Sequence, residues 1–161
     1  MLVLLRYGSY AIIHFDNLIN KEDMHGKIWS DRTILKSFPN PIREAYEIKH
    51  KCEGELTFLG VLNQPHFADI YLTLYPAEKI IELKSLKLYF QQFRAKVIPY
   101  ERLINIIYDD VMAVYQPIRL RIDMKTNARG GIQSRLTIDS DWSVRGGKEI
   151  FKDWFGQFDE W

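Results

Sequence analysis

The chain has 161 residues, of which 47% are hydrophobic and 27% are charged, proportions typical of a globular protein. Its formal net charge is +1, which disfavours a general electrostatic attraction to nucleic acid or to an anionic membrane. The single cysteine, Cys52, cannot form an internal disulfide and is typical of a reducing compartment. We therefore expect one cytoplasmic domain over residues 1–161 that binds neither nucleic acid nor a membrane.

The N-terminal part of the chain predicts a hairpin followed by a loop. The segment LLRYGSYAIIHFDNL has its expected bend at Gly8 and Ser9. The apolar run before Arg6 has five residues, which is too short for a signal peptide or a membrane span. Residues 31–46, DRTILKSFPNPIREAY, contain two prolines and are predicted to form an ordered surface loop.

Two segments then alternate apolar and polar residues with the period of two that is typical of β-strands. The first is YEIKHKCEGEL and the second is FADIYLTLY. The residues expected to share a face are Tyr46, Ile48, His50 and Cys52 in the first strand, and Ala68, Ile70, Leu72 and Leu74 in the second.

Two helices are predicted next, over residues 83–95 and 100–115, with Pro99 between them. In the first helix Lys84 and Lys87 share one face. The apolar stripes expected to be buried are Leu83, Leu86, Phe90 and Phe93 in the first helix, and Leu103, Ile107, Val111 and Val114 in the second.

A second strand pair is predicted after the helices. PIRLRIDMK places Ile118, Leu120, Ile122 and Met124 on one face, and NARGG turns the chain into the strand GIQSRLTID. The C-terminal segment predicts a short helix docked on the body or on a neighbouring subunit, through the aromatic residues Trp154, Phe155, Phe158 and Trp161.

The order of elements is strand, strand, helix, helix, strand, strand, which predicts an α+β fold. A four-stranded antiparallel sheet with two helices on one face satisfies both the alternation and the connections. The other face of this sheet still carries Phe67, Tyr71 and Tyr75, which favours an oligomer that closes several sheets into a barrel.

Three stretches, ELKSLKLYF, NQPHFADIYLTLYP and NARGG, together resemble one known family. It is the family of NADPH-dependent 7-cyano-7-deazaguanine (nitrile) reductases of queuosine biosynthesis, a tRNA-modification pathway. These enzymes belong to the tunnelling-fold (T-fold) superfamily with GTP cyclohydrolase I. The resemblance covers about residues 37–138 and leaves the N-terminal hairpin and the aromatic C-terminal segment as extensions of a single T-fold domain.

The resemblance implies a role for several residues at a site between subunits of a homo-oligomer. Glu82 and Glu101 would bind the substrate base, because a carboxylate accepts hydrogen bonds from the adjacent N–H donors of a guanine-like edge. Tyr100 precedes Glu101, where the family has histidine. The phosphates of NADPH would contact Lys84, Lys87 and Arg129.

The residues of the family's reaction are changed in this chain. In the family a cysteine thiolate attacks the nitrile to give a thioimide, which hydride from NADPH reduces. Gly60 stands at the position of that cysteine, in a loop one residue shorter, and His66 stands at the position of the proton-transferring aspartate. Cys52 is a possible substitute nucleophile, but it lies eight residues upstream in the predicted strand.

Each of these assignments has a structural alternative. Lys84 and Lys87 could form a solvated helix face, Glu82 and Glu101 could cap helices, and His66 could be structural. Two classes of function remain open. One is a relative without the thioimide reaction that binds a purine-, deazaguanine- or pterin-like base or only assembles with a partner; the other is an active or altered reductase. The four histidines are scattered along the sequence, and we expect no metal site.

Overall fold

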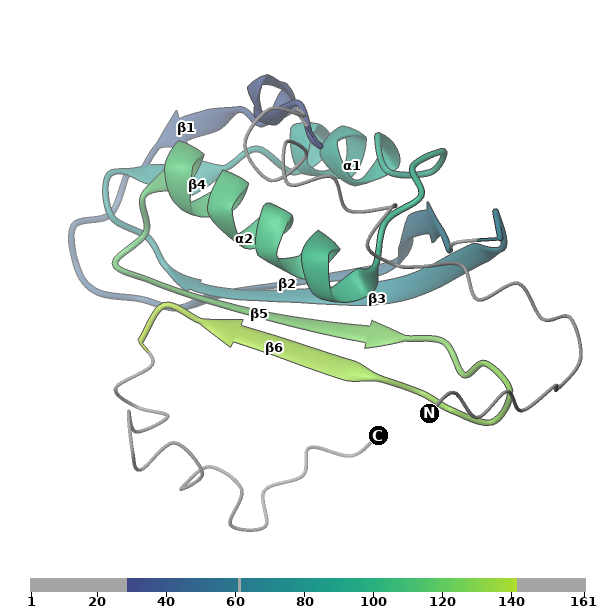
Figure 1. Ribbon diagram of the computed structural model, residues 1–161. Coiled ribbons are helices and arrows are strands. Elements are labelled where there is room, and N and C mark those ends of the chain that lie inside the picture. Colours follow the sequence, from purple (N-terminus) through teal and green to yellow (C-terminus); the bar gives the residue numbers. More distant parts are fainter. Residues whose placement is uncertain (1–28, 61, 142–161) are drawn as a thin grey trace, which may run out of the picture.

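The computed structural model describes residues 29–60 and 62–141, so the predicted N-terminal hairpin and the aromatic C-terminal segment lie outside the described residues. Four strands form one antiparallel sheet in the order β2-β3-β5-β6 (Figure 1). Their bounds are Ile48–Leu59 for β2, Pro65–Tyr75 for β3, Arg119–Thr126 for β5 and Arg135–Asp139 for β6.

Two helices, α1 (Leu83–Gln91) and α2 (Tyr100–Tyr115), cover one face of this sheet, as Figure 1 shows. This arrangement confirms the predicted α+β architecture, a four-stranded antiparallel sheet with two helices on one face. The core lies between the two layers, and the predicted inward residues of the strands and of α2 supply much of it. Fully buried members of the core include Ile70, Leu72, Leu74, Phe90, Phe93, Leu103, Ile107, Val111, Leu120, Ile122 and Met124.

Two residues predicted to be buried are exposed. Leu83 is 58% exposed, because it begins α1 and lines an open hollow between that helix and β2. Ile118 is 73% exposed, because β5 begins only at Arg119. Helix α1 also ends earlier than predicted: the chain leaves it after Gln91 and turns, and the Lys96 carbonyl then accepts a hydrogen bond from the Leu59 N–H at 2.9 Å.

The predicted loop over residues 31–46 contains regular structure. Asp31 caps a short 3-10 helix, Arg32–Ile34, by accepting from the Thr33 N–H at 2.9 Å. Strand β1 (Ser37–Pro39) then pairs antiparallel with β4 (Lys79–Ile81). These three-residue strands are too short to produce a visible alternation in the sequence.

Strand β2 contains a bulge that the alternation did not reveal. Cys52 pairs with Ile70, but Leu56 pairs with Ala68, so four residues of β2 advance while β3 advances by two. Gly54 accommodates the two extra residues of β2 at φ +65, and its N–H donates to a carboxylate oxygen of Asp69 at 3.0 Å.

Within the described residues, no helix is long and apolar enough to cross a membrane.

Candidate functional site

Gly60 lies in a tight turn between β2 and β3. Its N–H donates to the Gln64 carbonyl at 2.9 Å, and its own carbonyl accepts from the Asn63 N–H at 2.8 Å. The preceding residue, Leu59, is bonded on its other side to the segment that leads into α2, because its carbonyl accepts from the Ile98 N–H at 3.0 Å. The turn is therefore anchored to the sheet and to the start of α2.

The His66 imidazole occupies the space beside Gly60. A Cβ atom added to Gly60 would lie 2.5 Å from Nε2 and 3.1 Å from Cδ2 of that ring. His66 is fixed by its register opposite Phe58, on whose ring it stacks at 5.2 Å between centroids and 15° between planes. A side chain at residue 60 and the imidazole in this position exclude each other.

Arg129 reaches the same point from the β5–β6 hairpin. The Arg129 N–H donates to the Ile132 carbonyl at 2.7 Å, the Ile132 N–H returns a bond at 3.0 Å, and Gly130 and Gly131 supply the positive φ angles of the turn. The guanidinium Nη1 contacts Nε2 of His66. Because arginine can only donate, Nε2 must accept, and the neutral ring carries its proton on Nδ1.

The surroundings of His66 favour this neutral form. Partial burial, and then the nearby charge of Arg129, lower the pKa of His66 below its ordinary value. The imidazole therefore acts near neutral pH as a hydrogen-bond acceptor toward Arg129 and as a donor through Nδ1.

Tyr100 and Glu101 begin α2 at the same end of the sheet, two and three residues after Ile98. Pro99 precedes the helix and makes no side-chain cap, so Glu101 is an exposed acidic residue of the first turn rather than the cap itself. The fold thus gathers Gly60, His66, Arg129, Tyr100 and Glu101 around one end of the sheet.

Glu82 and Lys84 lie at the start of α1, away from the Gly60 turn. Glu82 caps α1: its carboxylate accepts from the Ser85 N–H at 2.6 Å and the Lys84 N–H at 3.0 Å, and these bonds, that of Ser85 first, lower its pKa. The capping interpretation therefore holds for Glu82. The nine-residue helix is about 13 Å long, and its other end leads to the Gly60 turn, so Glu82 does not join that turn within one chain.

Lys87 already has a partner that the sequence did not reveal. Its Nζ lies 3.3 Å from a carboxylate oxygen of Glu55, a residue within the β2 bulge. The other carboxylate oxygen of Glu55 lies 4.0 Å from Arg94. Lys87 lines a hollow of about 410 Å³ between α1 and β2, together with Lys49 and Lys51. Glu53 and Glu55 line the same hollow, and each of the three lysines is already paired with a glutamate, Lys49 with Glu47 and Lys51 with Glu53, so a phosphate bound there would have to displace a carboxylate. Arg129 lies at the Gly60 turn and does not join these lysines within one chain.

Cys52 also lines this hollow. Burial, and then the charge of Glu55, raise the pKa of its thiol to about 11. Its partner in the sheet, Ile70, stands five residues along β3 from Pro65, the partner of Leu59, which corresponds to about 17 Å. Cys52 is thus a protonated thiol far from the Gly60 turn.

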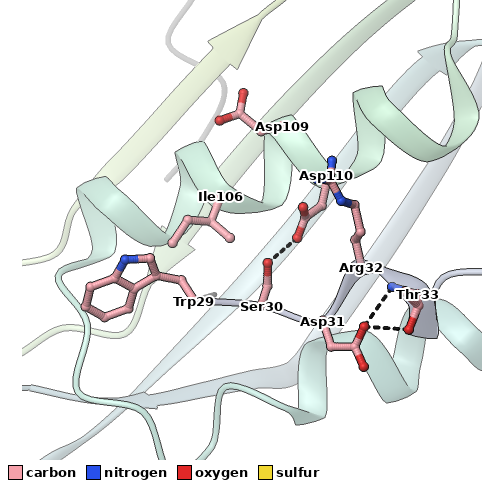
Figure 2. A pocket seen from close by; sticks show the side chains of 8 residues that line it. All are labelled: Trp29, Ser30, Asp31, Arg32, Thr33, Ile106, Asp109 and Asp110. Atoms are coloured by element: carbon pink, nitrogen blue, oxygen red, sulfur yellow. Dashed lines mark hydrogen bonds between the residues drawn. The ribbon is translucent and has the colours of Figure 1, made fainter. Parts of the chain in front are cut away.

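A second hollow, of about 380 Å³, lies where the residues before β1 meet α2 (Figure 2). In Figure 2 the Ser30 hydroxyl points at Asp110, to which it donates a hydrogen bond, and Asp31 faces Thr33. Tyr89 also donates to Asp110, at 2.7 Å. These bonds connect the residues before β1 to the two helices.

Among the described residues no group of three or more histidine, cysteine, aspartate or glutamate side chains could hold a metal ion.

Comparison with known proteins agrees with this architecture. A crystal structure of the archaeosine synthase QueF-Like in the apo form superimposes with a TM-score of 0.51 and 13% identity, over 62% of this chain and 95% of that one. The two-layer fold and this likeness define an α+β protein of the T-fold class.

Sequence comparison gives the family. The model of the QueF-like protein family matches residues 65–144. The NADPH-dependent 7-cyano-7-deazaguanine reductase of Magnetococcus marinus is 39% identical over 70% of this chain and 89% of its own length. The enzymes of the same name from Rhodopirellula baltica and Gloeobacter violaceus are 36% and 44% identical, over 68% and 61% of this chain and 91% and 72% of their own lengths. The chain belongs to this QueF-like family.

Proposed function

We propose that this chain binds a planar base of the purine, deazaguanine or pterin type and does not use the family's thioimide reaction. The observation that carries the proposal is the position of His66, whose Nε2 lies 2.5 Å from where a Cβ of residue 60 would stand. Glycine supplies no nucleophile at this position, and the imidazole in its present position occupies the space that a nucleophilic side chain would need. A thiolate at that point is what would divide the difficult reduction of a nitrile into easier steps.

Base binding is assigned to the end of the sheet that holds Glu101. An exposed carboxylate in the first turn of α2 is a suitable acceptor for the adjacent N–H donors of a guanine-like edge. Tyr100, partly buried against the core, fixes the start of the helix next to it. Glu82 and Lys84 at the start of α1, and Lys87 at its middle, would complete a site from a neighbouring subunit of a homo-oligomer.

The cofactor-binding part of the proposal concerns Lys84 and Lys87. Both are exposed on α1, and Lys87 lines the hollow together with Lys49 and Lys51. The two lysines of α1 would hold phosphates of NADPH beside that hollow. NADPH, when bound, supplies a hydride.

Calorimetric titration tests base binding. We expect 7-deazaguanine, guanine or a pterin to bind the wild-type chain, and Glu101→Ala to lose about 1–3 kcal/mol because the donors of the base lose their acceptor. Glu44→Ala, an exposed glutamate between β1 and β2, is the matched control. Equal affinity in wild type and Glu101→Ala would remove Glu101 from the site.

The alternative is an active reductase, and the similarity to enzymes named NADPH-dependent 7-cyano-7-deazaguanine reductase favours it. An NADPH-oxidation assay with 7-cyano-7-deazaguanine, combined with mass spectrometry of the protein, separates the two. We expect neither turnover nor a covalent adduct. Turnover accompanied by an adduct on Cys52 would overturn the proposal and make that cysteine the nucleophile.

A pair of variants sharpens this test. Gly60→Cys alone should form little adduct with the nitrile, because the His66 ring stands in the way. Gly60→Cys combined with His66→Asp removes the ring and supplies both of the family's residue types, so more adduct is expected from the double variant. A Cys52→Ala background keeps the native thiol out of the measurement.

A further inference from the structure

An apolar strip runs along one edge of the sheet, between α2 and β6. It consists of four half-buried side chains, those of Tyr108 and Met112 in α2 and of Leu136 and Ile138 in β6. Strand β6 is the last strand of the four-stranded sheet, and within residues 29–60 and 62–141 no further strand pairs with it (Figure 1). The strip is therefore where the core stays partly open at this edge.

The two residues of β6 face the helices but are incompletely covered by them. Leu136 pairs with Met124 and Ile138 pairs with Ile122, and both of these β5 residues are fully buried. Directly opposite residues of neighbouring strands lie on the same face of a sheet, so Leu136 and Ile138 also point to the helix side. Because they are only half-buried, α2 leaves room for a further element above the edge strand.

The two residues of α2 lie on the side of that helix that faces away from α1. Asp110 marks the opposite side, because it accepts a hydrogen bond from Tyr89 of α1 at 2.7 Å. With 3.6 residues per turn, Tyr108 and Met112 each point roughly 160° away from Asp110 around the helix axis. Burial above all, with a contribution from the charge of Asp139 in β6, raises the pKa of Tyr108, which agrees with a position beside that strand.

The described part of the chain ends close to this strip. The Ser140 N–H donates to the Leu120 carbonyl at 2.8 Å, and the Asp141 N–H donates to a carboxylate oxygen of Asp139 at 3.0 Å, directly after β6. Leu136, at the far end of the strip, lies five residues back along the strand, or about 17 Å. The next six residues, 142–147, span up to about 20 Å when extended, so residues 148–161 can reach the whole strip.

Residues 148–161 have the sequence pattern of an amphipathic helix. Their apolar residues recur at i, i+1, i+4, i+5, i+8 and i+11, a spacing that places side chains on one face of a helix. These residues are Ile150, Phe151, Trp154, Phe155, Phe158 and Trp161. Lysine, aspartate, glutamate and glutamine occupy most of the positions between them. A helix of this length is marginal in water by itself and is stabilised by covering its apolar face.

We infer that residues 148–161 form a helix whose aromatic face covers the strip of Tyr108, Met112, Leu136 and Ile138 in the same chain. The segment is connected to the strip by a few residues, which keeps it at an effective concentration on the order of millimolar. A second copy of the chain would have to reach the strip from the bulk solution at a lower concentration. The inference concerns the edge of the sheet and is independent of the proposed base binding.

Hydrogen–deuterium exchange of the full chain, measured by mass spectrometry, tests the inference. We expect the amides of residues 148–161 to exchange at least about tenfold more slowly in the wild type than in a synthetic peptide of the same sequence. Met112→Lys places a charge in the strip and should remove this protection. Ile106→Lys is the matched control and should keep it, because Ile106 is also half-buried on α2 but lines the hollow on the opposite side of the helix.

Disulfide trapping distinguishes the same chain from a neighbouring one and does not depend on the folding of Met112→Lys. Both pairs of variants are made in a Cys52→Ala background, which removes the native thiol. Met112→Cys combined with Phe155→Cys should form an intrachain disulfide at least about tenfold faster than Ile106→Cys combined with Phe155→Cys. Non-reducing electrophoresis separates intrachain from interchain products.

Three results would overturn the inference. The first is exchange in residues 148–161 that is as fast as in the synthetic peptide, or protection that survives in Met112→Lys. The second is equal trapping rates for the two cysteine pairs. The third is a disulfide between residues 112 and 155 that forms mainly between two chains, which would assign the strip to the segment of a neighbouring copy.

Discussion

The phenol oxygen of Tyr89 lies 2.7 Å from a carboxylate oxygen of Asp110, in the interior between α1 and α2. Both residues are buried, and Ser30 donates a second hydrogen bond to the same oxygen. Burial, followed by the bond to Asp110, raises the pKa of Tyr89 far above its ordinary value, so the phenol stays protonated and remains a donor. This relationship joins the two helices and the segment that precedes β1.

Tyr89→Phe should therefore lower the free energy of unfolding by about 1–3 kcal/mol, because the buried Asp110 carboxylate loses a donor. Urea unfolding followed by circular dichroism measures the change. Tyr108→Phe removes the hydroxyl of a less buried tyrosine on α2 and should stay within about 0.5 kcal/mol of wild type. Equal losses in the two variants would show that the hydrogen bond contributes no more than a surface hydroxyl.

The contact between Gly60 and His66 predicts a coupling between these positions. Gly60→Ala should destabilise the wild type by about 1 kcal/mol, because the new Cβ would push the imidazole away from its stacking on Phe58 and its hydrogen bond with Arg129. In a His66→Ala background the same substitution should cost at least about 0.5 kcal/mol less. Gly54→Ala, which is strained by its positive φ and meets no atom within 4 Å, should cost the same in both backgrounds. Additive effects of Gly60→Ala and His66→Ala would contradict the contact.

Stability should fall as the pH drops below about 6.5. Burial first, and for His66 also the charge of Arg129, lower the folded-state pKa of His50 and His66. The unfolded chain then takes up the protons at a higher pH than the folded chain does, so stability is retained above the unfolded pKa and lost as the pH falls toward the folded one. Denaturant unfolding between pH 5 and pH 8 measures the slope.

Replacing each histidine in turn measures its contribution to this pH dependence of stability. His66→Gln and His50→Gln should each flatten it, and His66→Gln should do so without affecting the hollow between α1 and β2, because His66 does not line that hollow. An unchanged slope in both variants would place the pH dependence in other groups.

Cys52 should react slowly with alkylating reagents at neutral pH. Its pKa of about 11 leaves little thiolate, and the thiolate is the nucleophile. Labelling with iodoacetamide, followed by mass spectrometry, should be much slower at pH 7.5 than for glutathione and should accelerate as the pH rises toward 10. Glu55→Gln removes a nearby charge that raises this pKa and should speed the reaction. Rapid labelling of the wild type at pH 7.5 would restore Cys52 as a candidate nucleophile.

Glu55 should also compete with any phosphate that binds Lys87. Glu55→Gln removes the carboxylate that lies 3.3 Å from that lysine, and affinity for NADPH should rise about two- to fivefold. Glu44→Gln, an exposed glutamate between β1 and β2 that does not line this hollow, serves as the control. An unchanged affinity in Glu55→Gln would argue against phosphate binding at Lys87.

The long elements could be predicted from the sequence because their periodicities are sustained. The alternation from Ala68 to Leu74 and the stripe from Leu103 to Val111 each extend over several repeats, and both sets are buried as predicted. The three-residue strands β1 and β4 and the bulge in β2 could not be predicted in the same way. They depend on pairing with distant residues, and Gly54 was the single local indication of the bulge.

The site could be predicted as a set of residues but not as an arrangement. The sequence predicts Gly60 and His66 as two separate site positions. That the His66 ring occupies the place of a side chain at residue 60 depends on the length of the turn between them. Glu82 precedes α1, and Glu101 lies in the first turn of α2. The sequence does not show that the length of α1 separates Glu82 from the Gly60 turn. The ion pair of Lys87 with Glu55 depends on where the bulge places that part of β2.

The bulge at Gly54 divides β2 into two halves that keep their pairing independently. Residues from Ile48 to Cys52 follow one register against β3, and residues from Leu56 to Leu59 follow another, offset by two. Deleting one residue between the halves would turn the side chains of one half to the opposite face of the sheet, whereas deleting two would restore regular pairing and keep both faces. The half of the strand that leads to Gly60 can therefore vary in length in steps of two while Cys52 and the hollow beside α1 stay in place.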